Sequence, residues 1–244
     1  MRLKTNLHFH TAEDPHDLVG YTLKEGIDHA SSLGFEVLAV TCHNYFAWTK
    51  EHAEYAEEKG ILLIPGIELT IAEEKKLKRN GYRKGYHTLV INADKDAEDI
   101  FTFDDLKEYR KKRGGEIAVI AAHPYFYGNF SLKGYLEKYV NLYDAVEHSW
   151  YYSRVFNRNK KAMRFALKNE LPFVATSDTH YLYNNHMDRN YAYLDTDEKT
   201  IEATVNAIKN GDIENVTKPS NTIRDMILLQ IWFEISKLVK KRKR

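Results

Sequence analysis

Side chains that can bind a metal ion recur along the sequence at the ends of short apolar segments. There are nine of them, seven histidines, one glutamate and one aspartate: His8, His10, His16, His43, Glu68, His87, His123, Asp178 and His180. Imidazole nitrogens and carboxylate oxygens together suit zinc, manganese or iron, whereas the lack of a cysteine cluster disfavours a structural zinc site. Because alternate residues of a strand point to the same side, His8 and His10 can reach one ion. The pattern therefore predicts a metal site assembled from several strands.

Seven apolar segments indicate strands, and segments with helical spacing lie between them. The strands are expected at residues 3–9, 35–41, 61–64, 86–91, 117–122, 143–146 and 173–176. The helices are expected at residues 23–33, 47–59, 102–113, 132–139 and 153–169, with Thr22 as the N-cap of the first. Buried strands that alternate with helices predict a parallel sheet, closed or open. In a parallel barrel the carboxyl ends of the strands meet on one face, so the nine side chains would converge there.

Composition and charge narrow the class of protein. The chain has 244 residues, of which 43% are hydrophobic and 29% charged, as is typical of a globular protein. A formal net charge of +1 indicates neither nucleic-acid nor membrane binding by the molecule as a whole, so any basic patch must be local. Cys42 is the single cysteine, which excludes an intramolecular disulfide. The N-terminus has no apolar targeting segment and nothing reaches the roughly 20 apolar residues of a membrane span, so we expect a cytoplasmic protein.

We expect a single domain over residues 1–244, because the sequence has no internal repeat and no low-complexity linker. Apolar residues recur at helical spacing over residues 222–243, and this predicted C-terminal helix would pack on the barrel or form a dimer contact. Residues 73–85, here called the basic loop, follow Glu68 and contain six cationic side chains: Lys75, Lys76, Lys78, Arg79, Arg83 and Lys84. This loop would act as a cationic lid over the site or be a solvated connection.

Six short motifs occur in a fixed order: HFHTAEDPH, TCHN, PGIELT, YHTLVI, AAHPY and ATSDTH. Together they resemble the motifs of the polymerase and histidinol phosphatase (PHP) superfamily, and the resemblance spans residues 5–195. It implies an α/β fold, namely a distorted (βα)7 TIM-like barrel with a metal centre at the C-termini of the strands. It also implies two or three bound divalent ions (zinc, manganese or iron) and a hydrolase that acts on phosphate esters.

The resemblance implies a ligand role for each of the nine side chains. A first ion would be held by His8, His10, Glu68 and Asp178, a second by Glu68, His87 and His123, and a third by His16, His43 and His180. One residue departs from the family pattern, because Cys42 stands where relatives commonly carry an aspartate. This cysteine would be either an inert buried thiol or a change in the surroundings of the metal ions.

The expected reaction is hydrolysis of a phosphate monoester of a small metabolite, such as a histidinol-phosphate-like compound or a nucleotide, by attack of a metal-bound hydroxide. Glu68 would bridge two ions, and Asp178 would orient the attacking water. Arginine matches two phosphate oxygens at once, so Arg158 and Arg189 are candidate phosphate contacts, although a solvated helix face explains each equally well. Among the residues without a ligand role, His148 could line the pocket.

Three other functions stay open. A phosphodiesterase or exonuclease acting on nucleotides or single-stranded nucleic acid would use the basic loop, the KKRKR tail and nearby aromatic residues such as Tyr125, Tyr127 and Trp150. A non-catalytic RNA-binding subunit with this barrel is a second alternative, which the full ligand set disfavours. Amidohydrolase or deacetylase chemistry is a third, disfavoured by the lack of a lysine at the end of a predicted strand.

Overall fold

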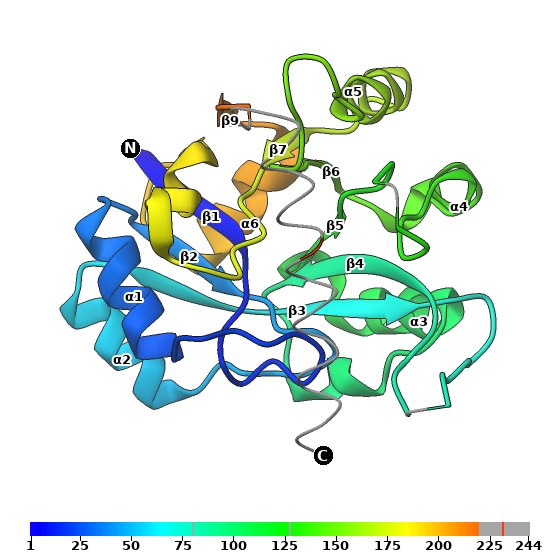
Figure 1. The fold of residues 1–244 in the computed structure, drawn as a ribbon, viewed down its shortest axis with the longest axis horizontal. Coiled ribbons are helices and arrows are strands. Elements are labelled where there is room, and N and C mark those ends of the chain that lie inside the picture. The colour runs from blue at the N-terminus through cyan, green and yellow to red at the C-terminus, as the bar shows by residue number, and fades with distance from the viewer. Residues whose placement is uncertain (80, 127, 220–230, 232–244) are drawn as a thin grey trace.

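The strands form a barrel-shaped sheet, and helices lie around it (Figure 1). The computed structural model describes residues 1–79, 81–126, 128–219 and 231. The strands are β1 (Arg2–Phe9), β2 (Val37–Val40), β3 (Leu62–Ile71), β4 (Tyr86–Ile91), β5 (Ala118–Ala121), β6 (Ala145–His148), β7 (Phe173–Ala175), β8 (Asn190–Asp195) and β9 (Ile213–Thr217). The α-helices are α1 (Leu23–Ser32), α2 (Lys50–Glu58), α3 (Phe103–Arg113), α4 (Gly134–Lys138), α5 (Asn159–Lys168) and α6 (Ile201–Asn210). Short 3₁₀ helices are η1 (Lys95–Asp99), η2 (Gly114–Glu116), η3 (Val140–Leu142) and η4 (Tyr183–Arg189).

The nine strands in the described part of the chain form one sheet in the order β7-β6-β5-β4-β3-β2-β1-β8-β9. β1, β2 and β3 pair in parallel, and so do β5, β6 and β7. β4 runs antiparallel to β3 and β5, β8 runs antiparallel to β1, and β9 runs antiparallel to β8. The prediction of an α/β barrel-like fold is confirmed, but the prediction of a parallel sheet holds for only some of the strands. Strict strand-helix alternation is interrupted as well, because the described residues between β3 and β4 contain no helix.

The reversed direction of β4 brings His87 to the same end of the barrel as the other histidines. His87 stands near the start of β4, and antiparallel pairing sets it opposite Thr70, near the end of β3. The prediction that the third strand ends at residue 64 is wrong, since β3 continues to Ile71. Residues 66–71 pair with the whole of β4, and Glu68 therefore lies inside a strand rather than after it.

A β-bulge in β1 aims His8 and His10 into the barrel. Between Asn6 and Phe9 the chain advances by three residues, while the paired positions of β2 advance by two. Leu7 belongs to the interior core and His8 to the side chains grouped at the end of the barrel, whereas Phe9 packs outward in the layer that includes α1. The side-chain oxygen of Asn6 accepts a hydrogen bond from the amide of His8 (3.3 Å) and so holds the bulge.

Two sets of hydrogen bonds close the sheet into a barrel. Thr179, which follows β7, pairs with the end of β1: the amide of His10 donates to the carbonyl of Thr179 (3.0 Å), and the amide of Thr179 donates to the carbonyl of His8 (3.2 Å). On β7 itself, the Asn215 side chain of β9 donates to the carbonyl of Phe173 (2.7 Å) and accepts from the amide of Ala175 (2.6 Å). One side-chain amide thus replaces a strand neighbour.

The remaining predicted helix boundaries agree with the structure in part. The predicted N-cap at Thr22 is confirmed, since it forms a capping box with Glu25. The helix expected at 153–169 begins only at Asn159, whose side chain is hydrogen-bonded to the backbone of Ser149 in both directions. The strand-helix-strand unit β8-α6-β9 has no counterpart in the prediction. The predicted C-terminal helix at 222–243 lies outside the described residues apart from residue 231.

None of the described helices is long and apolar enough to cross a lipid bilayer.

The role of Asn215 in closing the barrel can be tested by mutation. We expect Asn215→Ala to lower the free energy of unfolding by about 1 kcal/mol, because two hydrogen bonds at a partly solvated edge are lost. Thermal unfolding would show a drop in Tm of about 2–4 °C. Asn141→Ala, at an exposed position with no side-chain hydrogen bond among the described residues, is the matched control. Equal Tm values for the two variants would contradict this role.

Candidate metal centre

The carboxylate of Glu68 lies at the centre of a group of five imidazole rings. Its Oε2 atom is 3.2 Å from Nε2 of His8, 3.3 Å from Nε2 of His10 and 2.9 Å from Nε2 of His43. Its Oε1 atom is 2.8 Å from Nδ1 of His87 and 3.1 Å from Nε2 of His123. The Glu68 side chain is only 1% exposed. A single buried carboxylate therefore links side chains from four strands and their following loops.

Asp178 and His180 extend this group on the side of β1. The Oδ1 atom of Asp178 is 3.4 Å from Nε2 of His8, 3.3 Å from Nε2 of His10 and 3.3 Å from Nδ1 of His180. Nitrogen and oxygen atoms of His8, His10 and Asp178 lie within 4.8 Å of one another, and the same holds for His10, His43 and His180. These are separations that divalent ions could span. The structure thus brings together eight of the nine residues expected from the sequence, and His16 lies beside them.

His16 reaches the group through Asp17, a carboxylate that was not among the predicted ligands. Its Nδ1 atom is 3.2 Å from Oδ1 of Asp17, while Oδ2 of Asp17 is 3.1 Å from Nε2 of His180. His16, Asp17 and His43 form a further set of potential ligands within 4.8 Å. Asp17 directly follows His16 in the chain, and this adjacency to a predicted ligand is the signal that could have identified it.

Two more buried carboxylates hold the outer nitrogen atoms of the rings. Oδ2 of Asp14 is 2.8 Å from Nδ1 of His10 and 2.9 Å from Nδ1 of His43. Oε1 of Glu147 is 2.7 Å from Nδ1 of His8. A carboxylate at Nδ1 fixes the ring orientation and the tautomer, and it leaves Nε2 with a lone pair for a metal ion.

These two residues could have been recognised from spacing. Asp14 lies four residues after His10 within the first motif. Glu147 lies two residues after Ala145, which faces the barrel interior, whereas His148 points to the other side of β6 and packs against Phe173 (ring centroids 5.4 Å apart). His148, expected at the pocket, does not line it.

The donor atoms fit divalent ions on two grounds. Nε2 of His8, Nε2 of His10 and Nδ1 of His87 are buried and have no hydrogen-bond partner in the described residues, although each lies close to a carboxylate oxygen. Buried polar atoms of this kind are costly unless a partner is supplied. The donor set of imidazoles and carboxylates is also the one that zinc, manganese and iron favour.

The electrostatics of the group point the same way. Burial lowers the pKa of His8, but the carboxylates of Asp178, Glu68 and Glu147 outweigh it and raise the pKa to about 10. Burial lowers the pKa of His43 too, and Glu68 and Asp14 raise it to about 10. Burial raises the pKa of Glu68, yet His87, His43 and His8 hold it well below the usual range. The ionised carboxylates are stabilised by nearby positive charge. Protonated histidines supply this charge in the metal-free protein, and divalent ions can supply it instead.

Asp178 is the carboxylate of this group that is most open to solvent. Its side chain is 20% exposed, and its Oδ2 atom accepts a hydrogen bond from Nε1 of Trp150 (3.3 Å). Asp178 (φ 46°) and His123 (φ 27°) both adopt positive φ, which is uncommon for residues other than glycine and is often found at functional sites.

A cavity of about 1210 Å³ opens onto the candidate metal ligands. His16, His43, Glu68, His87, His123, Asp178 and His180 line its floor. Phe126, Phe130, Trp150 and Tyr151 form an aromatic wall, and Phe130 stacks on His87 with 4.8 Å between ring centroids. Lys76, Lys78, Arg79, Arg83 and Lys84 of the basic loop also line the cavity.

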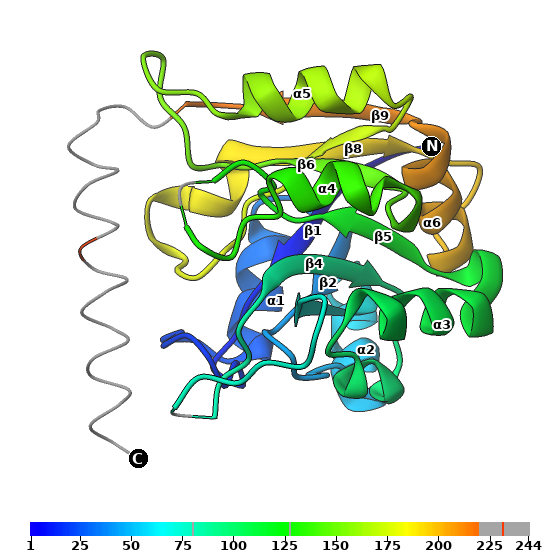
Figure 2. The same cartoon turned by 90° about the vertical axis from the view of Figure 1, so that its right-hand side faces the viewer.

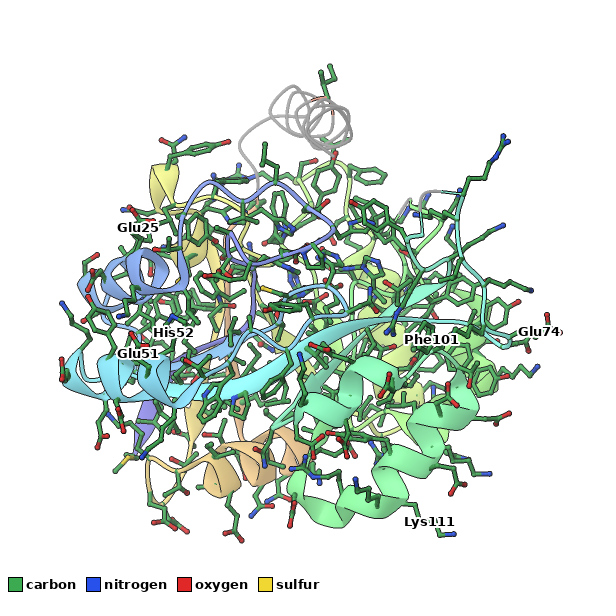
Figure 3. The ribbon with its side chains drawn as sticks, turned by 90° about the horizontal axis from the view of Figure 1, so that it is seen from below. Glu25, Glu51, His52, Glu74, Phe101 and Lys111 are labelled. Atoms are coloured by element: carbon green, nitrogen blue, oxygen red, sulfur yellow. The ribbon has the colours of Figure 1, made fainter. Side chains whose placement is uncertain are left out.

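The basic loop is anchored at two places. The guanidinium of Arg83 donates to the carbonyls of Glu98 and Ile100 and lies 3.7 Å from the ring centroid of Phe101, which is labelled in Figure 3. The hydroxyl of Tyr82 donates to the carbonyl of Pro15 (3.1 Å), next to His16. The loop therefore forms part of the cavity wall.

The predicted phosphate contacts and Cys42 have other surroundings. Arg158 is exposed at the start of α5 and lines a small neighbouring pocket, and Arg189 donates to the carbonyl of Pro219 (2.6 Å); neither lines the main cavity. Cys42 is fully buried 3.3 Å from the hydroxyl of Thr11, and burial raises the pKa of its thiol to about 12, so it stays protonated. This matches an inert buried thiol.

Comparison with known proteins agrees with the motifs. Residues 6–202 match the family model described as PHP domain. The chain belongs to the PHP domain family. No curated protein sequence matches the chain.

Solved structures with the same fold have low sequence identity to this PHP-domain protein. A two-domain protein from Bacteroides vulgatus, described as containing a predicted PHP-like metal-dependent phosphoesterase, has a TM-score of 0.61 and 18% identity over 89% of this chain and 65% of its own. The lesion-specific endonuclease Q of Pyrococcus furiosus has a TM-score of 0.61 and 14% identity over 94% of this chain and 66% of its own. An amidohydrolase from Chromobacterium violaceum has a TM-score of 0.56 and 15% identity over 89% of this chain and 98% of its own. The chain spans about two thirds of the first two proteins.

Asp14 is expected to control metal affinity without binding metal itself. Oδ2 of Asp14 accepts from the rings of His10 and His43, and Oδ1 accepts from two backbone amides. In Asp14→Asn an NH2 group, which cannot accept, replaces one of these oxygens, so one set of contacts is lost. Metal affinity should fall about 10–100-fold, as is usual when a carboxylate behind a histidine ligand is lost. Titration calorimetry with zinc or manganese measures this. Asp96→Asn, at an exposed ion pair with Lys112, is the control, and equal affinities of the two variants would exclude the role.

Metal binding should release protons and become tighter as the pH rises. His8 and His43 have pKa values of about 10 without metal, so both are protonated near neutral pH and must lose a proton to bind an ion. Each proton displaced should raise the logarithm of the apparent affinity by about 1 per pH unit. Calorimetry from about pH 6 to about pH 8, in buffers of different ionisation enthalpy, counts the protons. A pH-independent affinity would contradict the electrostatic account.

Proposed function

We propose that this PHP-domain protein is a metal-dependent phosphoesterase and that it hydrolyses a phosphate monoester of a small, ring-bearing metabolite of nucleotide size. The observation that carries the proposal is the convergence of five imidazoles on the Glu68 carboxylate, with unpartnered ring nitrogens directed at carboxylate oxygens. His8, His10, Glu68 and Asp178 would hold one ion, His87, His123 and Glu68 a second, and His16, His43 and His180, with Asp17, a third. Ions bound there would lower the pKa of water and neutralise charge on phosphate oxygens.

Residues of the cavity could also orient the attacking water and bind the substrate. Asp178 lines the cavity and its side chain is 20% exposed, so its carboxylate can accept a hydrogen bond from an attacking water. Trp150 donates to its Oδ2 atom and holds the side chain in place. The cationic side chains of the basic loop favour an anionic ester in the cavity. The aromatic wall offers flat apolar surface to a ring on the leaving group.

A second candidate is phosphodiester hydrolysis on nucleic acid. The cavity of about 1210 Å³ exceeds the roughly 300–1,000 Å³ that is typical of small-molecule pockets. A larger substrate would use this space and the cations at its edge. The similar fold of endonuclease Q fits this candidate but shows only that the barrel can carry such an activity.

Loss of ligands is the first test. The metal-loaded protein should hydrolyse p-nitrophenyl phosphate, and His123→Ala and Asp178→Ala should each lower kcat about 100-fold or more, because both remove groups from the reacting centre. His52→Ala is the control, since His52 lies on α2 at the periphery of the molecule (Figure 3). Wild-type rates in either ligand variant would overturn the proposal.

The choice between ester classes needs a second substrate. Bis-p-nitrophenyl phosphate has the same leaving group in a diester. A higher kcat/KM for p-nitrophenyl phosphate supports the monoesterase, and a much higher value for the diester supports the second candidate.

A further inference from the structure

Two of the candidate ligand rings, His87 and His123, are held differently from the others. At three other rings, the Nδ1 atom lies within 2.9 Å of a buried carboxylate, Asp14 or Glu147. Within the described residues, no carboxylate lies in that position at Nε2 of His87 or Nδ1 of His123, which are the ring atoms facing away from Glu68. These two rings, which would share the second ion, therefore need another means of orientation.

The aromatic ring of Phe130 packs against both histidines. It stacks on His87 with 4.8 Å between ring centroids and 21° between planes, and it meets His123 edge to face at 5.3 Å and 84°. Phe126 stacks on the same ring at 5.4 Å. Aromatic rings in contact prefer defined orientations of this kind, so a ring fixed at this place restricts how the two imidazoles can turn.

The backbone around Phe130 is joined to the same two histidines. The amide of His87 donates to the carbonyl of Phe130 (2.8 Å), and the hydroxyl of Ser131 donates to the carbonyl of His123 (3.2 Å). β4 and β5 lie side by side, and the green segment that leads from β5 to α4 passes the end of the barrel where β4 begins (Figure 2). The segment that carries Phe130 therefore connects the two strands at the point where their histidines stand.

Phe130 can occupy its place because residue 128 has no side chain. A Cβ atom on Gly128 would lie 2.2 Å from Cε1 and 2.3 Å from Cζ of Phe130, much less than the roughly 3.5–4.0 Å between carbon atoms in contact. The φ angle of Gly128 lies outside the left-handed region, so this position favours glycine for the close approach of the ring and not for its backbone conformation. A Cβ on Gly134, at the start of α4, would meet no described atom within 4 Å beyond its own helix and chain neighbours.

We propose that Phe130 is a positioning residue for the second ion. Its ring, seated against Gly128, holds the imidazoles of His87 and His123 in the orientation that turns both toward the bridging carboxylate. A ring that served only as a surface for substrate would require neither the hydrogen bond to His87 nor a glycine at position 128. The inference rests on the proposed metal centre, but it does not depend on which phosphate ester is hydrolysed.

An aromatic neighbour acts on an imidazole differently from a carboxylate. A carboxylate at the outer nitrogen both orients the ring and makes it more basic, whereas a stacked ring orients it alone. Loss of the Phe130 ring should therefore weaken the binding of one ion by a modest factor and should not abolish it.

The test uses two matched pairs of variants of the full chain. Phe130→Leu removes the ring beside the two histidines, and Phe173→Leu removes a ring that packs against His148, which is not a candidate ligand (ring centroids 5.4 Å apart). Gly128→Ala adds a methyl group that displaces the Phe130 ring, whereas Gly134→Ala adds one where there is room for it. Zinc binding to the metal-free protein is measured by titration calorimetry, and zinc per chain is measured after dialysis.

Phe130→Leu and Gly128→Ala should each weaken the binding of one zinc ion about 3–10-fold, the effect of one lost aromatic contact, and should leave the other ions bound as in the wild type. Phe173→Leu and Gly134→Ala should bind zinc like the wild type. In the hydrolysis of p-nitrophenyl phosphate, kcat of Phe130→Leu should fall at limiting zinc and recover at saturating zinc with an unchanged KM, because the defect lies in the occupancy of the ion.

Wild-type zinc affinity in either Phe130→Leu or Gly128→Ala, or an equal loss of affinity in the two phenylalanine variants, would overturn the inference. So would a kcat that stays low at saturating zinc, because that result places Phe130 at the substrate and not behind the ligands. Weaker zinc binding by Phe130→Leu, in a protein that hydrolyses no phosphate ester, would refute the proposed function and leave the positioning role standing.

Discussion

A carboxylate can stay ionised inside a protein only if hydrogen bonds or positive charges take the place of the water that burial removes. Glu68 meets this condition through five imidazole nitrogens, three at one oxygen and two at the other. The rings in turn need carboxylates at their outer nitrogens, which Asp14 and Glu147 provide for three of them. The result is a buried network of alternating charge in which removal of any member leaves an unpaired partner. Most features of the barrel end serve to bring these groups to one place.

Three irregularities of the sheet make that convergence possible. The bulge in β1 turns His8 and His10 inward after Leu7 has already faced the core. The reversal of β4 presents its first residues, rather than its last, to the end of the barrel that holds the candidate metal ligands. The pairing of Thr179 with β1 sets Asp178 and His180 beside His8. In a regular barrel some of these side chains would point into the apolar interior or away from it.

The sequence predicted which residues lie at the site better than it predicted how the strands position them. Histidines at the ends of apolar segments, ordered in family motifs, were enough to indicate the barrel, the residues that the structure brings together and their end of the sheet. Strand direction was not predictable, because an apolar run such as residues 86–91 has the same pattern in parallel and antiparallel pairing. The bulge was hidden for the same reason, since alternation alone cannot place both Leu7 and His8 inside. Asp14, Asp17 and Glu147 were not predicted, because an acidic residue near a histidine is common in any sequence. Their spacing makes them candidates, and their burial separates them from other acidic residues.

The hydrogen bonds between the Asn215 side chain and β7 indicate where this domain ends. The family match stops at residue 202, inside α6, yet the side chain that pairs with β7 comes from β9, beyond that point. The described sheet therefore extends beyond the residues that match the family model. A fragment cut at the family boundary would keep every proposed metal ligand and still expose the edge of β7, with the unpaired amide and carbonyl groups that promote association between sheets. We therefore expect a stable fragment of this protein to extend at least through Thr217, the last residue of β9.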